Sequence, residues 1–172
     1  MKKIVINENN LDISNINKTN IKVRALLALK NEILVANYGG VLMLPGGKID
    51  KGETNKEALI RELKEETGII YNEEELNDLF LLEYYQANYP TRDGKILNRL
   101  IKTYFYYDKF KGINKDKQHM TEKEIKGNFS LQLIEINDLL NNLSDTSNPR
   151  SEFFNREITE AIKVYKKIKT ED

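Results

Sequence analysis

The chain contains 172 residues, of which 40% are hydrophobic and 31% are charged, so we expect a single globular domain over residues 1–172 rather than a disordered protein. Its 27 Lys and Arg balance its 27 Asp and Glu, which argues against a general electrostatic surface for DNA or for an anionic membrane. The absence of cysteine excludes disulfide bonds, thiolate zinc sites and a cysteine nucleophile.

The first twenty residues contain one short apolar run, Ile4 to Ile6, followed by an Asn-rich polar stretch that ends at Asn20. This pattern predicts an edge strand and a loop. The sequence turns polar too early for a signal peptide, and no run approaches the roughly 20 apolar residues of a membrane span. We therefore expect a soluble, cytoplasmic protein.

Residues 21–29 alternate loosely between apolar and polar side chains, and a second apolar run follows at residues 33–36. The intervening Lys30-Asn31-Glu32 predicts a hairpin. A third short strand is expected over residues 41–44.

The rest of the chain predicts helices and strands in alternation. We expect a helix over residues 54–67 that stops at Gly68, a long hairpin of residues 79–85 and 101–110, a strand over 131–136, a short helix over 137–143 and an amphipathic helix over 150–168. The charged segment 112–127 shows no periodicity, so no regular element is predicted there.

Three acidic residues of the expected helix, Glu62, Glu65 and Glu66, are spaced at i, i+3 and i+4. Residues with this spacing are neighbours on one face of an α-helix, so the three carboxylates should converge. Their mutual repulsion would be relieved by a hard divalent cation such as Mg²⁺ or Mn²⁺, which prefers oxygen ligands. Such a site is typical of phosphoanhydride hydrolysis.

The residues before the helix suggest how this face is organised. Gly46 and Gly47 can adopt backbone angles that turn a carbonyl toward a metal. Glu53 in the loop and Arg61 on the helix could form an ion pair that clamps the loop to the helix. Arg61 could alternatively contact phosphate.

These residues resemble, position for position, the Nudix box, a motif of nine defining positions. The matching residues are Gly47, Glu53, Arg61, Glu62, Leu63, Glu65, Glu66, Gly68 and Ile69. The resemblance implies an α/β fold over residues 21–168, a Nudix-type α/β/α sandwich with a mixed β-sheet. It also implies an Mg²⁺-dependent pyrophosphohydrolase, with Mn²⁺ as an alternative ion.

The same resemblance implies roles for single residues. Glu65 and Glu66 would be the principal metal ligands, Glu62 a further ligand or water activator, and the Gly47 carbonyl another ligand. Glu53 and Arg61 would orient this face.

Members of the family often add an acidic residue from a later loop. Glu122 and Glu124 are the candidates here, and we favour Glu122. His119 lies close by in the sequence and could assist.

The resemblance implies a small-molecule substrate, a nucleoside diphosphate linked to a further group X, which the box does not specify. Nucleoside triphosphates, dinucleoside polyphosphates, nucleotide sugars and ADP-ribose all fit this description. Tyr85 could stack on a base, and Arg24 and Arg92 could hold phosphate or a base edge.

Two alternative functions stay open at this point. One is a nucleotide-sensing Nudix domain without turnover, against which the complete set of carboxylates argues. The other is removal of pyrophosphate from RNA 5′ ends, which a basic surface would favour. A homodimer is also compatible with the sequence, because the first twenty residues could pair with a neighbouring chain.

Overall fold

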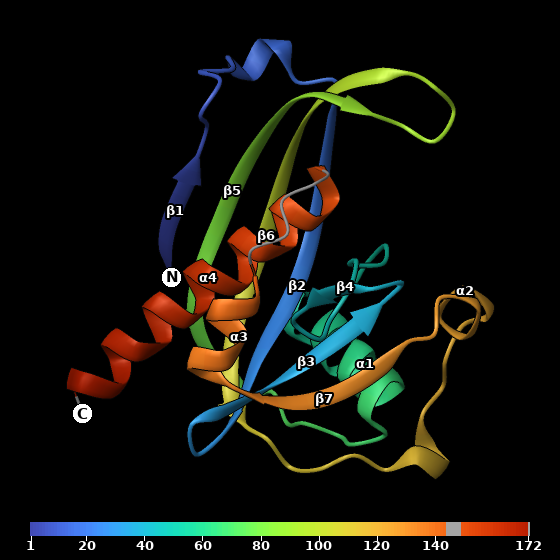
Figure 1. Cartoon of the computed structure of the whole chain (residues 1–172), viewed down its shortest axis with the longest axis vertical. Helices are drawn as coiled ribbons and strands as arrows, with labels where there is room; N and C mark the ends of the chain where they lie inside the picture. Colours follow the sequence, from blue (N-terminus) through green and yellow to red (C-terminus); the bar gives the residue numbers. More distant parts are fainter. Residues whose placement is uncertain (144–148, 172) are drawn as a thin grey trace.

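The computed structural model describes residues 1–143 and 149–171. Within them, a seven-stranded sheet has the order β1-β5-β6-β2-β3-β4, with β7 paired to β3 (Figure 1). The strands are β1 (Lys2–Ile6), β2 (Lys18–Leu29), β3 (Glu32–Tyr38), β4 (Val41–Met43), β5 (Asn77–Pro90), β6 (Ile96–Lys109) and β7 (Ser130–Glu135). The helices are α1 (Asn55–Thr67), α2 (Glu122–Lys126), α3 (Ile136–Asn142) and α4 (Pro149–Glu171).

The sheet is mixed, as predicted. β1 pairs with β5 and β2 pairs with β6 in parallel, whereas the remaining pairs are antiparallel. β1 is an edge strand at one end of this order, as its short apolar run predicts.

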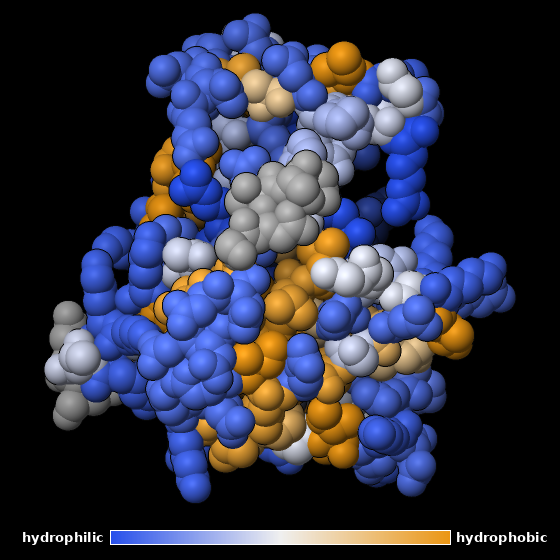
Figure 2. Space-filling view, in the orientation of Figure 1, coloured by the Kyte–Doolittle hydropathy of each residue, from blue (hydrophilic) through white to orange (hydrophobic). Residues whose placement is uncertain are grey.

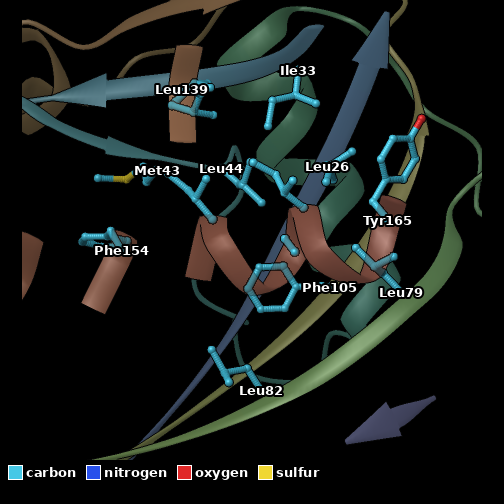
Figure 3. Close-up of a cluster of buried hydrophobic side chains, with 14 of the residues drawn as sticks. Leu26, Ile33, Met43, Leu44, Leu79, Leu82, Phe105, Leu139, Phe154 and Tyr165 are labelled. Atoms are coloured by element: carbon cyan, nitrogen blue, oxygen red, sulfur yellow. The ribbon is translucent and has the colours of Figure 1, made fainter. Parts of the chain in front are cut away.

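Helices cover both faces of the sheet. Alternate side chains of the central strand β2 point to opposite faces, and each set belongs to a separate apolar core. Val23, Ala25 and Leu27 join the apolar residues of α1 on one face. Leu26 and Ala28 join those of α4 on the other face, which Figure 3 shows around Phe105 and Phe154. A strand whose side chains are buried on both sides needs such a three-layer arrangement. The predicted α/β/α sandwich is therefore confirmed.

The long hairpin is confirmed, and its strands are longer than predicted. β5 continues to Pro90, and β6 begins already at Ile96. The pairing of the two strands is irregular between Gln86 and Tyr89. The first hairpin is much smaller than predicted. β2 pairs with β3 only at Ala28 and Leu29, because β2 is taken up along its length by parallel pairing with β6, and β3 pairs with β7 instead.

The charged segment 112–127 contains structure that its sequence does not predict. Thr121 caps α2, and its side chain and that of Glu124 form a reciprocal capping box. Upstream, the backbone N–H of Asn114 donates to the Thr67 carbonyl, and the Gln118 amide donates to the Glu66 carbonyl. These bonds satisfy carbonyls at the end of α1 that have no partner within the helix. The segment is therefore hydrogen-bonded to the C-terminal end of α1.

The surface is largely hydrophilic. In the view of Figure 2, hydrophobic side chains gather below the centre, over β3 and β7, between hydrophilic flanks. No helix among the described residues is both long enough and apolar enough to span a bilayer.

Candidate active site

Helix α1 begins and ends where local chemistry predicts. Thr54 caps its N-terminus in a capping box with Glu57, and Gly68 ends it in the left-handed conformation, with φ of 72°. The helix presents Glu62 and Glu66 to the preceding glycine loop, and Glu65 lies 3.7 Å from Arg61 one turn earlier. Their exposure differs: the side chains of Glu62 and Glu65 are 16% and 38% exposed, while residue Glu66 is 5% exposed.

Glu66 is a buried carboxylate held by the glycine loop. Its Oε2 accepts a hydrogen bond of 2.9 Å from the backbone N–H of Gly46. Burial raises the pKa of Glu66 to about 8, while the nearby Arg24 charge and the Gly46 bond act in the opposite direction. Glu62 and Glu124 raise this pKa further, so their carboxylates lie within electrostatic reach of Glu66.

Glu62 lies directly against the second glycine. A Cβ atom added to Gly47 would be 2.3 Å from the Glu62 Oε1 atom, so any larger residue there would displace this carboxylate from its present position. Burial raises the pKa of Glu62, and the charge of Glu65 raises it too. Two carboxylates of α1 therefore converge on the Gly46–Gly47 loop.

The expected ion pair between the loop and the helix is present. The Arg61 guanidinium donates to both carboxylate oxygens of Glu53, at 2.7 and 3.0 Å, and to Glu62 at 2.9 Å. It also donates to the Lys48 carbonyl at 3.1 Å. The hydrogen bonds from Arg61 are the main reason that the pKa of Glu53 falls to about 2. Arg61 thus joins the loop to the carboxylate face.

The donor atoms of this face fit a divalent cation in kind and in charge. Carboxylate oxygens are the ligands that Mg²⁺ and Mn²⁺ prefer, and a cation would favour the charged forms of Glu62 and Glu66, which burial and, to a smaller extent, repulsion between carboxylates disfavour by raising their pKa values. Within residues 1–143 and 149–171, however, no three acidic or histidine side chains already form a metal-ligand cluster. Glu62 is instead turned toward Arg61.

The two glycine carbonyls also have protein partners. The Gly47 carbonyl accepts a hydrogen bond of 2.9 Å from the Val23 N–H, so it is directed toward β2. The Gly46 carbonyl accepts a hydrogen bond from Arg24. The role of the Gly47 carbonyl as a metal ligand stays a prediction.

A cleft of about 320 Å³ opens beside this face. Its floor is formed by the glycine loop and Glu66, and its walls carry cationic and aromatic side chains. The cationic residues are Lys22, Arg24, Lys48 and Arg150, and the aromatic residues are Tyr38, Phe129 and Phe154. Of the two later acidic residues, Glu124 lines the cleft, whereas Glu122 is exposed and does not. The role predicted for Glu122 stays a prediction, and Glu124, whose carboxylate accepts hydrogen bonds from Thr121 in the capping box, is the one of the two beside the cleft.

Comparison with known proteins identifies the family. A family model described as the NUDIX domain matches residues 19–156. The chain belongs to the Nudix hydrolase family. It is 42% identical over 71 residues to an 8-oxo-dGTP diphosphatase of Haemophilus influenzae, an alignment that covers 41% of this chain and 43% of that protein. It is 40% identical over 55 residues to an ADP-ribose pyrophosphatase of Methanocaldococcus jannaschii, covering 29% and 32%. The alignments thus span less than half the length of these relatives.

Solved structures support the Nudix fold over most of the chain. A NUDIX hydrolase from Nitrosomonas europaea is similar with a TM-score of 0.58 and 18% identity, covering 86% of this chain and 88% of that one. A MutT protein from Bacillus halodurans gives 0.54 and 18%, covering 81% and 82%. At this identity the likeness shows the fold alone.

Other predicted residues of the Nudix chain lie away from the cleft. Tyr85 is half-buried and lines a separate hollow with Ile6 and Pro149. Arg92 is exposed in the β5–β6 turn, which Figure 1 shows at the far end of the long hairpin from α1. The backbone N–H of His119 donates to the Glu65 carbonyl, and the residue is part of another hollow beside Lys64. The structure does not bring Tyr85 and Arg92 together with the Nudix box, and it places His119 against the backbone end of the box helix, outside the cleft.

Several residues of the cleft were not predicted from the sequence. Arg150 has its guanidinium 5.3 Å from the ring centre of Tyr38 and 5.8 Å from that of Phe154. Lys22 lies 5.2 Å from the same Phe154 ring. Such residues occur singly on any surface, and only the packing of α4 against β4 and β5 brings them beside the Nudix box.

Proposed function

We propose that this chain is a divalent-metal-dependent pyrophosphohydrolase that cleaves a phosphoanhydride bond in a nucleoside diphosphate linked to a further group. The observation that carries the proposal is the placement of Glu62 and Glu66 against the Gly46–Gly47 loop, which lines a cleft together with Glu66 and with cationic and aromatic side chains. The carboxylates suit a metal, the cations suit phosphates and the rings suit a base.

Each group has a distinct task in this proposal. Glu62, Glu65 and Glu66 would hold the metal, which supplies charge neutralisation and an acidified water when bound. Lys22, Lys48 and Arg150 would bind the phosphate oxygens. Water would attack one phosphorus atom as the bridging P–O bond breaks, and Glu124 would accept the proton of the water.

The names of the relatives support the reaction class. An 8-oxo-dGTP diphosphatase and an ADP-ribose pyrophosphatase both carry names of enzymes that cleave diphosphate linkages in nucleotides, but they differ in the group beyond the diphosphate. The identity of this group is therefore a matter for experiment. The cytoplasmic location and the homodimer stay predictions.

The direct test is a substrate panel assayed with Mg²⁺, with Mn²⁺ and with excess chelator. The panel contains nucleoside triphosphates including 8-oxo-dGTP, dinucleoside polyphosphates, nucleotide sugars, ADP-ribose and 5′-triphosphorylated RNA. We expect metal-dependent turnover of at least one small nucleotide. Turnover that persists in chelator would refute the mechanism, and turnover of RNA alone would favour the RNA alternative.

Replacing the clamp residue by Arg61→Lys is expected to lower kcat/KM about tenfold or more, because lysine cannot bond both Glu53 oxygens and Glu62 at once. The pKa of Glu53 should then rise from about 2 toward its ordinary value. Steady-state kinetics and carboxyl NMR titration check the two effects. Arg156→Lys on the exposed side of α4 is the matched control, and an Arg61→Lys variant that behaves like it would contradict the clamp.

We expect kcat/KM to depend on pH through Lys22, a lysine of the cleft. Burial, assisted by Arg24, Arg99 and Lys48, lowers the pKa of Lys22 from 10.5 to about 8, although Glu157 opposes the shift. The charged form is lost as pH rises through about 8, so kcat/KM should fall above that pH. Lys22→Arg should extend the plateau to higher pH, because guanidinium stays charged.

A pH–rate profile of the wild type, of Lys22→Arg and of Lys18→Arg, an exposed lysine at the start of the same strand, checks this prediction. The Lys18 variant should keep the wild-type profile. Identical profiles for all three proteins would show that Lys22 does not hold the substrate.

A further inference from the structure

Two oppositely charged side chains are buried beneath the cleft, Arg24 from β2 and Glu157 from α4. Their side chains are 5% and 1% exposed, and 3.7 Å separates the Arg24 Nε from the Glu157 Oε2. Glu157 also accepts a hydrogen bond of 2.6 Å from the hydroxyl of Thr103 on β6. The pair therefore joins the C-terminal helix to two strands of the sheet.

The geometry of this ion pair is poor for stabilising the fold by itself. Its separation exceeds a hydrogen bond, and among the described residues neither the Arg24 Nε nor the Glu157 Oε2 has a hydrogen-bond partner. Buried ion pairs are often no more stabilising than apolar residues of the same volume. The contacts that the pair makes with neighbouring residues therefore give a better explanation for its presence.

The hydrogen bonds of Arg24 go to the loop that precedes α1. Its Nη1 donates to the Leu44 carbonyl at 3.0 Å and also to the Gly46 carbonyl. The N–H of the same Gly46 donates to Glu66 at 2.9 Å. Gly46 is thus held from both sides, by Arg24 through its carbonyl and by Glu66 through its N–H.

We propose that Arg24 and Glu157 are positioning residues for the carboxylate face of α1. Glu157, fixed by Thr103, orients the Arg24 guanidinium, and Arg24 holds the glycine loop so that the Gly46 N–H meets Glu66. This inference rests on the proposed function, since it concerns the same metal site. It replaces the substrate-binding role predicted for Arg24, whose hydrogen bonds are made to the protein.

The test measures Mn²⁺ binding to the full chain without substrate, by calorimetry and by the electron paramagnetic resonance spectrum of bound Mn²⁺. Glu157→Gln keeps the shape and can still accept the Thr103 bond but loses the charge, and we expect its Mn²⁺ affinity to fall about tenfold. Arg24→Lys should lose more, up to about 100-fold, because the shorter lysine lacks the planar guanidinium that sets its nitrogen between the Leu44 and Gly46 carbonyls while facing Glu157. Glu160→Gln, on the same helix, should bind as the wild type does.

A double variant, Arg24→Met with Glu157→Gln, separates positioning from charge balance. It contains no unpaired buried charge, so its thermal unfolding temperature should recover relative to the single variants. Its Mn²⁺ affinity should stay low, because the bonds to Leu44 and Gly46 are missing. Recovery of both would mean that the pair only balances charge, and would overturn the inference.

Kinetics on the substrate found in the panel give the second readout. The positioning role predicts a lower kcat with little change in KM for Glu157→Gln, because the metal face is disturbed while the cationic walls of the cleft are intact. If Glu157→Gln and Arg24→Lys both fold and bind Mn²⁺ like the wild type, the positioning role is overturned, while the proposed function is unaffected. A wild-type chain that binds no Mn²⁺ would overturn the proposed function and this inference with it.

Discussion

Glu66→Gln is expected to lower kcat/KM by about 1,000-fold, the order of effect seen when one preorganised electrostatic contact to a transition state is removed. The amide has no negative charge for a divalent cation, yet its oxygen can still accept the Gly46 N–H. In the metal-free protein the variant should be at least as stable as the wild type, since burial already disfavours the charged form of Glu66 by raising its pKa and the amide carries no charge at any pH. The carboxylate would then serve activity at the expense of stability.

Steady-state kinetics with Mg²⁺ and thermal unfolding in chelator check both parts of this expectation. Glu74→Gln, an exposed glutamate shortly after α1, is the matched control and should change neither quantity. An active Glu66→Gln variant would mean that the catalytic carboxylates are wrongly assigned. A variant that loses activity by unfolding would instead assign Glu66 to the structure of the loop.

Gly46→Ala should be among the most destabilising single substitutions in the chain. Gly46 has φ of 126°, and a Cβ atom there would be 2.3 Å from the Val23 carbonyl oxygen and 3.1 Å from the Arg24 Cα. Backbone strain of this kind costs about 1–3 kcal/mol, and the overlap with β2 adds to it, so we expect a loss of about 3 kcal/mol or more in the free energy of unfolding. Mn²⁺ affinity should fall as well, because Gly46 holds Glu66.

Urea unfolding of Gly46→Ala and of Gly94→Ala separates strain from overlap. Gly94 in the β5–β6 turn also has positive φ, of 80°, but an added Cβ would meet no atom within 4 Å. We expect a loss of about 1 kcal/mol there, from backbone strain alone. Equal losses for the two variants would show that the loop does not press against β2 as described.

Prediction from the sequence succeeded where the chemistry is local. The cap at Thr54 and the stop at Gly68 determine α1, and the spacing of Glu62 and Glu66 within it places both carboxylates against one loop. The β5–β6 hairpin and α4 were also predicted, although both extend further than their apolar patterns suggest. Turns, caps and helical faces depend on residues a few positions apart, so a single sequence reveals them.

Prediction failed where pairing is long-range. Nothing near β2 in the sequence indicates that it pairs in parallel with β6, residues 96–109, rather than along β3. The segment 112–127 was left without structure, although it caps α1 and places Glu124 in the cleft. Such contacts depend on which surfaces remain unpaired after the sheet forms, and local patterns do not record this.

The sequence by itself determined the family motif and the carboxylate face of α1, because these follow from spacing and capping within short segments, and the resemblance to the Nudix box implied the three-layer fold. Only the tertiary structure decided what surrounds that face. It brought Lys22 and Arg150 into one cleft, placed Glu124 but not Glu122 in the lining of that cleft, and set Glu157 beside Arg24. These residues are far apart in the chain, and no local sequence pattern marks any of them. Their roles arise only when α4 packs on the sheet and buries Glu157 beside Arg24, which holds the glycine loop.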